Sequence, residues 1–471
     1  MKQIIKLFKE NGYQLYQVGG SVRDELLGSE PNDIDLATDA TPEQMIKMYN
    51  RWFILQAKEF AMLNPDTINM IYSLQIWYSE NGIKHGTIIL IENNIDYEIT
   101  TFRKDVSTDG RNATVEFAKT IEEDLARRDF CLNAIAVNAY TGEIINPFTG
   151  QQDIKDKVIR FVGEPLQRIR EDYLRLFRVY RFLSQLGKGW KFVNNEDVSK
   201  CLIGELDMLS KERIRDEVIK IFKHNPCFAL YHMPEWLIMY IFHDILAPQV
   251  NQEFHGHFHA EDIRQHLMNT LSNSCRLTSN PLLRLACFLH DVGKCMEVEV
   301  NEWGYPTFPK HDTLGAERVE IWMKNMKFSN EEIHYVTQLI RHHMVNNHLF
   351  EQDKPQNRAI KRYVMALGEE LLDDMILLNY CDRAGNLANT KLCSYEEYLQ
   401  KHTIKPMWLE IKAKDTAFKV TDLKINGIDC MALGLQGKQI GDILKKIFEE
   451  VDSGLLVNER ETLLKRMREI K

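Results

Sequence analysis

The chain lacks the features of a membrane, secreted or zinc-ribbon protein. It has no run of about 18 apolar residues, so a membrane span is not expected. Its first residues, Met1 to Ile5, lack the long apolar core of a signal peptide. The 9 cysteines are scattered and form no Cys-x-x-Cys pair, which argues against a zinc ribbon. Dispersed cysteines of odd number instead favour reduced thiols and a cytoplasmic location.

An excess of positive charge is also missing. With 59 Lys and Arg against 68 Asp and Glu, the formal net charge is −9. The protein is therefore not a globally basic nucleic-acid binder, and any RNA contact must come from local basic patches whose binding weakens as salt rises. The 471 residues, 44% of them apolar, suffice for several domains with sizeable cores. We find no internal repeat and no low-complexity linker.

The pattern of the chain changes near residue 150. Before it, residues 14–18, 88–91 and 97–100 predict strands, and Thr41-Pro42-Glu43 predicts the start of a helix. After it, the pattern is almost wholly helical. We therefore expect an α+β fold in which a small mixed α/β head is followed by a helical neck, body and tail.

The most informative stretch runs from Val18 to Asp24 and contains a glycine turn. Asp33-Ile34-Asp35 follows on a predicted strand, where side chains two residues apart point to the same face. Two adjacent carboxylates repel unless a cation lies between them, and hard oxygen ligands suit Mg²⁺. Glycines let the backbone approach a phosphate closely, and Arg23 can neutralise it. These residues predict metal-dependent nucleotidyl transfer; the alternative is a surface turn before an edge strand.

Further motifs follow in a fixed order through about half of the chain. They are Glu98-Ile99-Thr100-Thr101-Phe102-Arg103, Asp109-Gly110-Arg111, Glu123-Asp124-Leu125-Ala126-Arg127-Arg128-Asp129-Phe130, Glu171-Asp172-Tyr173-Leu174-Arg175 and Glu212-Arg213-Ile214. Together with the glycine turn and the aspartate pair, this order resembles the nucleotidyltransferase family of class II tRNA CCA-adding enzymes and bacterial poly(A) polymerases.

This resemblance assigns roles to residues of the head. It implies that Asp33 and Asp35 hold the metal and that Gly20 and Arg23 bind the triphosphate. Arg128 matches the arginine that contacts the nucleotide. Glu98, on a neighbouring predicted strand, is the candidate third carboxylate that helps to activate an RNA 3′-hydroxyl, although an exposed strand acid would look the same.

The neck carries the most specific functional prediction. If residues 171–182 form one helix, Asp172 and Arg175 are neighbours on its surface. A carboxylate and a guanidinium together match the amino group and ring nitrogen that cytosine and adenine share, and reject uracil and guanine. Arg178 and Arg181 match family residues that help to hold the nucleotide. The alternatives are an ordinary amphipathic helix and a salt bridge between Asp172 and Arg175.

A second constellation lies in the helical part. His266, His290-Asp291 and Asp382 follow the order of the HD phosphohydrolase superfamily, which implies a second divalent metal of unknown identity. His311, His342 and His343 are extra candidates for ligand or phosphate contact. Some bacterial CCA-adding relatives carry this domain and hydrolyse phosphoesters.

Two segments depart from the family. About 25 extra residues, near positions 52–79, are expected to form a helical embellishment packed on the head, with a partner or RNA contact as the alternative. Asn112-Ala113 follows Asp109-Gly110-Arg111 where Arg-Pro is often found, which weakens the case for full CCA synthesis.

The resemblance therefore predicts a cytoplasmic tRNA nucleotidyltransferase that adds CCA from CTP and ATP, uses Mg²⁺ and releases pyrophosphate. It would be a monomer or homodimer. The rivals are an enzyme that adds only CC or only A, a poly(A) polymerase, an HD metal phosphohydrolase with an RNA-binding head, and a non-enzymatic RNA-binding protein. The expected domains are a catalytic head at 1–150, a neck and body at 151–250, an HD domain at 251–395 and a tRNA-contacting tail at 396–471.

Overall fold

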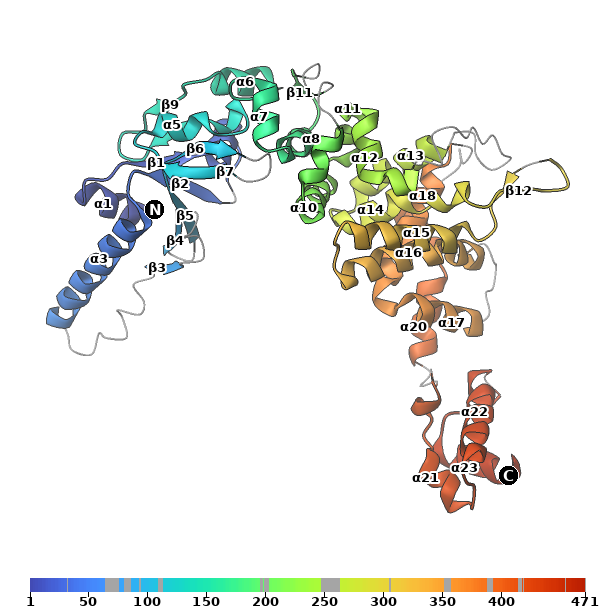
Figure 1. Ribbon diagram of the computed structural model, residues 1–471. Helices are drawn as coiled ribbons and strands as arrows, with labels where there is room; N and C mark the ends of the chain where they lie inside the picture. Colours follow the sequence, from blue (N-terminus) through green and yellow to red (C-terminus); the bar gives the residue numbers. More distant parts are fainter. Residues whose placement is uncertain are drawn as a thin grey trace. The chain divides into compact units, whose positions relative to one another are not determined.

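The computed structural model divides the chain into two compact units. One comprises Met1–Ile221 with Phe228–Met233, and the other Phe222–Cys227 with Pro234–Lys471. The first unit contains a sheet with helices and the second is mainly helical, which confirms the expected α+β class (Figure 1). The structure describes residues 1–31, 33–63, 76–79, 86–92, 95–108, 113–194, 198, 203–246, 263–304, 306–350, 357–387, 393–413, 417, 419–453 and 455–470.

The first unit is organised around a seven-stranded sheet in the order β3-β4-β5-β2-β1-β8-β9. The strands are β1 (Leu15–Val18), β2 (Ile34–Thr38), β3 (Ile76–Ser79), β4 (Thr87–Glu92), β5 (Ile95–Thr101), β8 (Ala136–Asn138) and β9 (Ile144–Ile145). Strand β2 is central, antiparallel to β1 and parallel to β5. The three strands predicted at 14–18, 88–91 and 97–100 are confirmed as β1, β4 and β5.

Hydrophobic residues cover both faces of this sheet. Along β2, Leu36 belongs to one core cluster, which also contains residues of the first and third helices. Ala37 belongs to the other cluster, together with Phe102 and Leu125. Because side chains alternate along a strand, Asp35 shares the face of Ala37, and the burial of its neighbours sets the direction of its carboxylate.

Helices and short strand pairs complete the first unit. The helices are α1 (Lys2–Glu10), α2 (Gly20–Leu26), α3 (Pro42–Leu63), α5 (Ile121–Ala126), η3 (Cys131–Asn133), α6 (Gly150–Asp156), α7 (Pro165–Glu171), α8 (Leu174–Leu186), η4 (Ile203–Met208), α10 (Lys211–Lys223) and α11 (Pro226–His232); the last two extend into the second unit. The paired strands are β6 (Arg103–Thr108) with β7 (Ala113–Phe117), and β10 (Val158–Ile159) with β11 (Lys191–Phe192). As predicted, α3 begins at Pro42.

The expectation of a helical embellishment packed on the head at 52–79 is confirmed for its first part and wrong for its last. Its first part continues α3, and Trp52 packs against the core cluster of Leu36. Its last part is a strand, because β3 pairs with β4 and extends the sheet. The edge of a sheet presents unpaired backbone N–H and C=O groups, and β3 joins β4 at such an edge. Residues 64–75 lie outside the described residues.

The second unit is built from helices. They are α12 (Glu235–Leu246), α13 (Ile263–Leu277), α14 (Pro281–Leu289), η6 (Val292–Cys295), α15 (His311–Asn325), α16 (Asn330–Phe350), α17 (Asn357–Leu367), η7 (Glu369–Leu371), α18 (Leu372–Gly385), α19 (Tyr395–Lys401), α20 (Ile404–Ala413), η8 (Val420–Asp422), α21 (Gly427–Ala432), α22 (Lys438–Asp452) and α23 (Arg460–Ile470). A hairpin of β12 (Glu299–Val300) and β13 (Pro306–Thr307) lies between η6 and α15. Among the described residues, none of the helices has the length and apolarity needed to cross a bilayer.

The packing of Gly150 at the start of α6 generates a stability prediction. A Cβ atom there would lie 2.3 Å from the Cys131 carbonyl oxygen and 2.7 Å from Ile135 Cγ1. Gly150→Ala should therefore lower the free energy of unfolding of the first unit by about 1–3 kcal/mol, through overpacking. Urea denaturation of the full chain measures this loss. Gly204→Ala is the control, because a Cβ atom there would meet nothing within 4 Å; equal midpoints for the two variants would contradict the argument.

Candidate active site and metal centre

The glycine turn, an arginine and an aspartate meet at the end of β1. Gly19 has φ 73° and ψ −132°, in the region that favours glycine, and α2 starts at Gly20. A Cβ atom on Gly19 would lie 2.7 Å from Arg128 Nη1 and 3.4 Å from Asp35 Oδ2. The missing side chain thus makes room for a guanidinium beside the carboxylate. The structure brings these sequence-predicted residues together.

Three carboxylates influence one another next to this turn. Asp35 is partly buried on β2 and lies in register with Glu98 on the parallel strand β5. Asp33 is exposed and precedes β2, which begins one residue later than predicted. Burial raises the pKa of Asp35, and the charges of Glu98 and Asp33 raise it further against the opposing effect of Arg128. A cation at this point would offset both the burial of the Asp35 charge and its repulsion by Glu98 and Asp33.

The three head carboxylates do not converge as tightly as a preformed metal cage. Among the described residues, groups of three or more potential ligands whose donor atoms all lie within 4.8 Å of one another occur only in the second unit. The head therefore presents a pair of aspartates with Glu98 nearby. Such a site suits an ion that takes its remaining ligands from water and substrate phosphates.

Fixed arginines line the same region. Arg23 is buried and donates from Nη1 to Asn133 Oδ1 at 3.0 Å, while its Nε donates to Asp24 Oδ1 at 2.8 Å. Arg128 follows the end of α5, and its Nη2 forms an ion pair with Asp124 Oδ2 at 3.1 Å. These contacts hold both guanidinium groups in place, so the positive charge beside Asp35 is preorganised.

The neck is not one helix, contrary to the prediction. Asp172 ends α7 with φ −154°, and α8 begins two residues later at Leu174. The Asp172 Oδ1 atom accepts a hydrogen bond from the Leu174 N–H at 3.1 Å. Aspartate competes with the helix backbone in this way, which explains the break. Residues 171 to 182 therefore form a bent segment with Asp172 at the corner.

The alternative considered above, a salt bridge between Asp172 and Arg175, is not formed, and each residue has another partner. Arg213 Nη2 on α10 lies 3.1 Å from Asp172 Oδ1 and 3.0 Å from Oδ2. Arg175 is 8% exposed and its Nη1 lies 2.7 Å from Glu171 Oε2. Its Nη2 also donates to the Arg127 carbonyl oxygen at 3.1 Å, which ties the neck to the end of α5.

Two further neck arginines meet buried carboxylates. Arg178 Nη2 lies 2.6 Å from Asp129 Oδ2, and Arg181 Nε lies 3.1 Å from Glu217 Oε2. Burial would raise the pKa of Asp129, but the charges of Arg178 and Arg181 and the hydrogen bonds from Asn133 and the Phe130 N–H together lower it. These pairs join α8 both to the segment after α5 and to α10.

Sequence reasoning missed the role of some of these partners. The sequence marks Glu212-Arg213-Ile214 as a motif but assigns it no role, whereas in the structure Arg213 forms an ion pair with Asp172. Asp129 follows the predicted Arg128 directly, yet only the fold reveals its contact with Arg178. The position of Asp129 directly after Arg127 and Arg128 is the sequence feature that could have indicated its role. Residues 109–111 lie outside the described residues.

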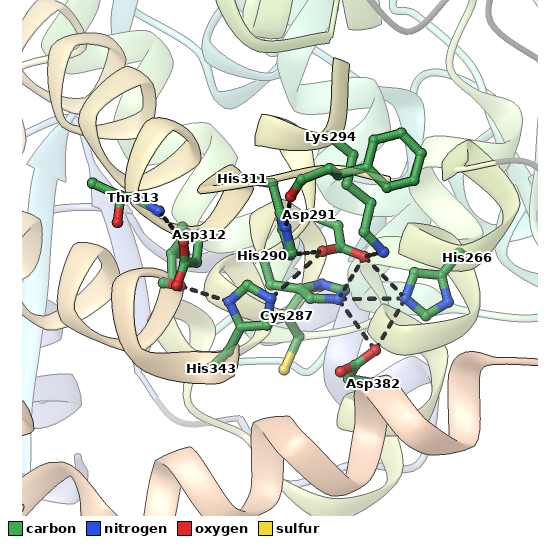
Figure 2. A network of polar contacts seen from close by, with 12 residues as sticks. His266, Cys287, His290, Asp291, Lys294, His311, Asp312, Thr313, His343 and Asp382 are labelled. Atoms are coloured by element: carbon green, nitrogen blue, oxygen red, sulfur yellow. Dashed lines mark hydrogen bonds and ion pairs between the residues drawn. The ribbon is translucent and has the colours of Figure 1, made fainter. Parts of the chain in front are cut away.

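The second constellation gathers at one point of the second unit (Figure 2). His266 comes from α13, His290 and Asp291 follow α14, and Asp382 lies on α18. The donor atoms of these four residues all lie within 4.8 Å of one another. His266 Nε2 lies 3.3 Å from His290 Nε2 and 3.1 Å from Asp382 Oδ1. The structure thus brings together the whole predicted HD set.

Contacts around this centre orient its ligands. His290 is fully buried, and its Nδ1 lies 3.0 Å from the Cys287 carbonyl oxygen, which leaves Nε2 facing the carboxylates. Burial alone would lower the pKa of His290, but Asp291 and Asp382 raise it well above the usual value. Burial would raise the pKa of Asp291, yet His290 and Lys294 hold it well below its usual value.

The three extra histidines separate into two groups. His311 and His343 are buried beside Asp291, and each Nε2 lies within 3.5 Å of Asp291 Oδ1. His342 is only partly buried, and its ring centroid lies 6.4 Å from that of Tyr363. Because consecutive helical residues point in different directions, His342 faces away from the cluster that contains His343.

Comparison with known families identifies two modules. A model of the poly A polymerase head domain matches residues 15–76 and 61–160, and a model of the HD domain matches residues 263–382. The chain thus contains a region similar to a nucleotidyltransferase head, a kind of domain that implies a divalent metal, and a region similar to an HD domain. Its relatives are CCA-adding enzymes, which confirms the resemblance inferred from the motifs.

Two relatives illustrate the sequence similarity. The CCA-adding enzyme of Geobacillus thermodenitrificans is 39% identical over 223 residues, which cover 46% of this chain and 48% of the relative. The human mitochondrial CCA tRNA nucleotidyltransferase 1 is 39% identical over 237 residues, covering 50% of this chain and 49% of the relative. The chain therefore matches about half the length of these curated relatives.

Solved structures extend the similarity of fold over the whole chain. The Bacillus stearothermophilus CCA-adding enzyme in complex with CTP aligns with 99% of this chain and 96% of its own, with a TM-score of 0.61 and 24% identity. The Thermotoga maritima CCA-adding enzyme complexed with tRNA-CCA covers 100% of this chain and 94% of its own, with a TM-score of 0.53 and 19% identity. At these identities the likeness concerns the fold.

The raised pKa of Asp35 predicts a link between metal and stability. Above its folded-state pKa, the ionised carboxylate is less favourable in the folded than in the unfolded protein, so it lowers the free energy of unfolding. In metal-free buffer near neutral pH, Asp35→Asn should therefore raise the melting temperature by about 2–4 °C. The gain should vanish at acidic pH, where Asp35 is protonated in both states. Differential scanning calorimetry measures both effects.

Two comparisons sharpen this measurement. Added Mg²⁺ should raise the melting temperature of the native protein and leave Asp35→Asn almost unchanged, because the variant has lost a ligand. Asp96→Asn, at an exposed position on the neighbouring strand β5, should behave as the native protein does. A melting temperature of Asp35→Asn below the native value in metal-free buffer would contradict the repulsion inferred at this site.

Proposed function

We propose that this protein is a tRNA nucleotidyltransferase that adds C, C and A to tRNA 3′ ends from CTP and ATP and releases pyrophosphate. The observation that carries the proposal is the convergence of Gly19, Arg128 and Asp35 at the end of β1, with Glu98 in register beside Asp35. The proteins similar to this chain include CCA-adding enzymes complexed with CTP and with tRNA. The reaction requires positioning and charge neutralisation more than covalent help from the protein.

We assign the head residues to the nucleotide and the reacting groups. Asp33 and Asp35 would hold Mg²⁺, which when bound supplies charge neutralisation for the attacking oxygen and the leaving diphosphate. Gly20 lies at the start of α2, where backbone N–H groups suit a phosphate. Arg23 and Arg128 supply fixed positive charge to the triphosphate. Glu98 is exposed on the same sheet face and would accept the proton of the RNA 3′-hydroxyl.

Asp172 and Arg175 would select the base. The carboxylate accepts from the exocyclic amino group, and the guanidinium donates to the unprotonated ring nitrogen. Cytosine and adenine both offer this pair of groups, whereas uracil offers a carbonyl beside an N–H. A mismatched base would leave polar groups unpaired, which makes the rejection strong. We assign Arg178 and Arg181 to the support of the bound nucleotide.

This selection starts from side chains that already have partners. Arg213 holds both oxygens of Asp172, but a carboxylate has further lone pairs and can accept from a base as well. Arg175 contacts Glu171 and backbone carbonyl groups, and a guanidinium has more donors than these bonds use. The partners therefore restrict the orientation of both groups before a nucleotide arrives.

The HD domain supports a second activity in the same chain. His266, His290, Asp291 and Asp382 offer two imidazoles and two carboxylates within reach of one divalent ion. We propose that this centre is a metal-dependent phosphohydrolase acting on phosphoesters. Metal bound by these residues would supply a Lewis acid and an activated water, and Lys294 beside Asp291 offers positive charge to a phosphate.

The decisive experiment offers the purified protein a tRNA that ends before CCA. Labelled CTP and ATP, supplied separately and together, should yield C addition with CTP alone and complete CCA with both. Sequencing of the extended ends reads the outcome. Failure to incorporate C would exclude CCA addition as the activity of this protein. Addition of C without A would indicate a CC-adding enzyme. Long A tracts would indicate a poly(A) polymerase.

Two substitutions should separate the two activities. Asp33→Ala is expected to abolish nucleotide incorporation, since removal of one ligand from an aspartate pair leaves the metal poorly held, while phosphoester hydrolysis persists. His290→Ala should abolish phosphoester hydrolysis, while nucleotide incorporation persists. A head variant that still extends tRNA would refute the assignment of Asp33. The substrates are the truncated tRNA for the head and a generic phosphodiester, bis-p-nitrophenyl phosphate, for the HD domain.

Arg213 generates a test of base selection. Arg213→Ala removes the contact that orients Asp172, so kcat/KM for CTP and ATP should fall about ten- to hundredfold, the equivalent of a hydrogen bond to a charged group. Because selection depends on that orientation, the preference for CTP over UTP should fall as well. Arg213→Lys should restore part of the preference. Arg215→Ala is the control, because Arg215 lies on the same helix and forms an ion pair with Asp216. An unchanged CTP to UTP ratio in Arg213→Ala would exclude a positioning role.

A further inference from the structure

Four cysteines of the second unit form two hydrogen-bonded pairs, although the sequence scatters them. Cys227, at the start of α11, contacts Cys275 on α13. Cys287 on α14 contacts Cys381 on α18. Cys287 and Cys381 are both 0% exposed, whereas Cys227 and Cys275 are only partly buried. The side chains of neither pair take part in the activities proposed above, and the partly buried pair can meet small solutes.

A buried arginine holds the backbone around the partly buried pair. Arg284 is 5% exposed, and its Nη2 donates to the Cys275 carbonyl oxygen at 3.3 Å. Its Nη1 lies 2.9 Å from the Lys223 carbonyl oxygen and 2.8 Å from the His224 carbonyl oxygen. One guanidinium thus anchors both the end of α13 and the turn that leads to Cys227. This shared anchor fixes the segments that carry the two thiols relative to each other.

The two thiols differ in chemical character. The hydrogen bond from Cys227 lowers the pKa of Cys275, and Arg284 and Ser274 lower it further against the effect of burial. The same hydrogen bond, together with burial, raises the pKa of Cys227. The nucleophile is the thiolate and not the thiol, so Cys275 is suited to attack an oxidant. Cys227 is then the neighbouring thiol that can react with the oxidised product.

We propose that Cys227 and Cys275 are an oxidation site, at which a peroxide converts the thiol pair into a reversible disulfide. The site is independent of the nucleotidyl transfer and the phosphoester hydrolysis proposed above. A disulfide requires sulfur atoms about 2.05 Å apart, and thiols already in hydrogen-bond contact need only a short approach to reach it. The bond closes a loop of about 50 residues and joins the start of α11 covalently to α13.

The reaction has two steps and consumes one molecule of hydrogen peroxide. The Cys275 thiolate attacks one peroxide oxygen, so that an S–O bond forms, the O–O bond breaks and hydroxide leaves. The Cys227 sulfur then attacks the sulfenic acid; the S–S bond forms as the S–O bond breaks, and the hydroxyl group leaves as water with the Cys227 proton. The hydroxide takes up the proton that Cys275 had released. The two thiols thus lose two electrons and two protons, and the peroxide is reduced to two water molecules.

Peptide mapping of the full-length chain tests the proposal. Trypsin places the two cysteines on adjacent peptides, 224–264 and 265–276, and neither peptide contains another cysteine. After brief exposure to dilute hydrogen peroxide and alkylation of the remaining thiols, mass spectrometry should find these peptides joined with the loss of two hydrogen atoms. Dithiothreitol should separate them. Absence of the joined peptides, or joining of Cys227 or Cys275 mainly to other cysteines, would overturn the proposal.

The buried pair supplies an internal control. Cys287 and Cys381 are also in hydrogen-bond contact, and that contact together with burial raises the pKa of Cys381. Figure 2 shows Cys287 beside the HD cluster. Because this pair is enclosed, Cys275 should lose its free thiol at least about tenfold faster than Cys287. A time course of differential alkylation measures both rates. Equal rates would show unselective oxidation and would overturn the assignment of a specific site.

Two serine variants assign the two steps. Serine keeps a hydrogen-bond donor but cannot form a disulfide. In Cys227→Ser the sulfenic acid on Cys275 should persist and react with dimedone, a reagent that labels sulfenic acids. In Cys275→Ser, Cys227 should stay unlabelled. Circular dichroism verifies that both variants are folded, and the mapping of the native chain depends on neither. Absence of the label from Cys275 in Cys227→Ser would overturn its assignment as the attacking thiol.

Discussion

The repulsion between carboxylates on the central strands is the constraint on which the proposed nucleotide site depends. The register of β2 with β5 sets Asp35 opposite Glu98, and the strands cannot slip to separate them. Leu36 and Ile99, the neighbours of these acids, are 1% and 0% exposed in the core. A slip by one residue would expose both apolar side chains, so the hydrophobic core holds the acidic groups together. The folded protein thus holds negative charges close together, and a metal ion and the fixed arginines can neutralise them.

Arginine–carboxylate contacts connect this part of the head to the neck helix α8. Arg128 is held by Asp124, while the next residue, Asp129, receives Arg178 from α8. Arg175 reaches the Arg127 carbonyl oxygen just before them. The short segment that supplies a charge beside Asp35 therefore also anchors the helix that is proposed to select the base. The residues proposed for phosphate binding and those proposed for base selection are therefore held by one connected set of contacts.

Much of this arrangement could be predicted from the sequence, because motifs and strand alternation are local. The glycine turn, the direction of Asp35 and the HD ligands follow from residues close together in the chain or from their order. The bend at Asp172 could not be predicted, because Leu174 N–H and Arg213 decide the course of the backbone there. For the same reason the sequence did not distinguish His343 from His342: only the packing of α16 shows which imidazole reaches Asp291.

The two proposed metal centres differ in ligand chemistry, and this difference bears on how one chain could run both proposed reactions. The head offers carboxylate oxygens near the surface, and such hard ligands hold a labile ion that arrives with a nucleotide. The HD centre offers buried imidazoles oriented by carbonyl groups, which favour a transition metal that stays bound. An excess of magnesium would then fill the first site without displacing the ion in the second. Ligand type, rather than separate regulation, is thus sufficient to keep the proposed activities apart.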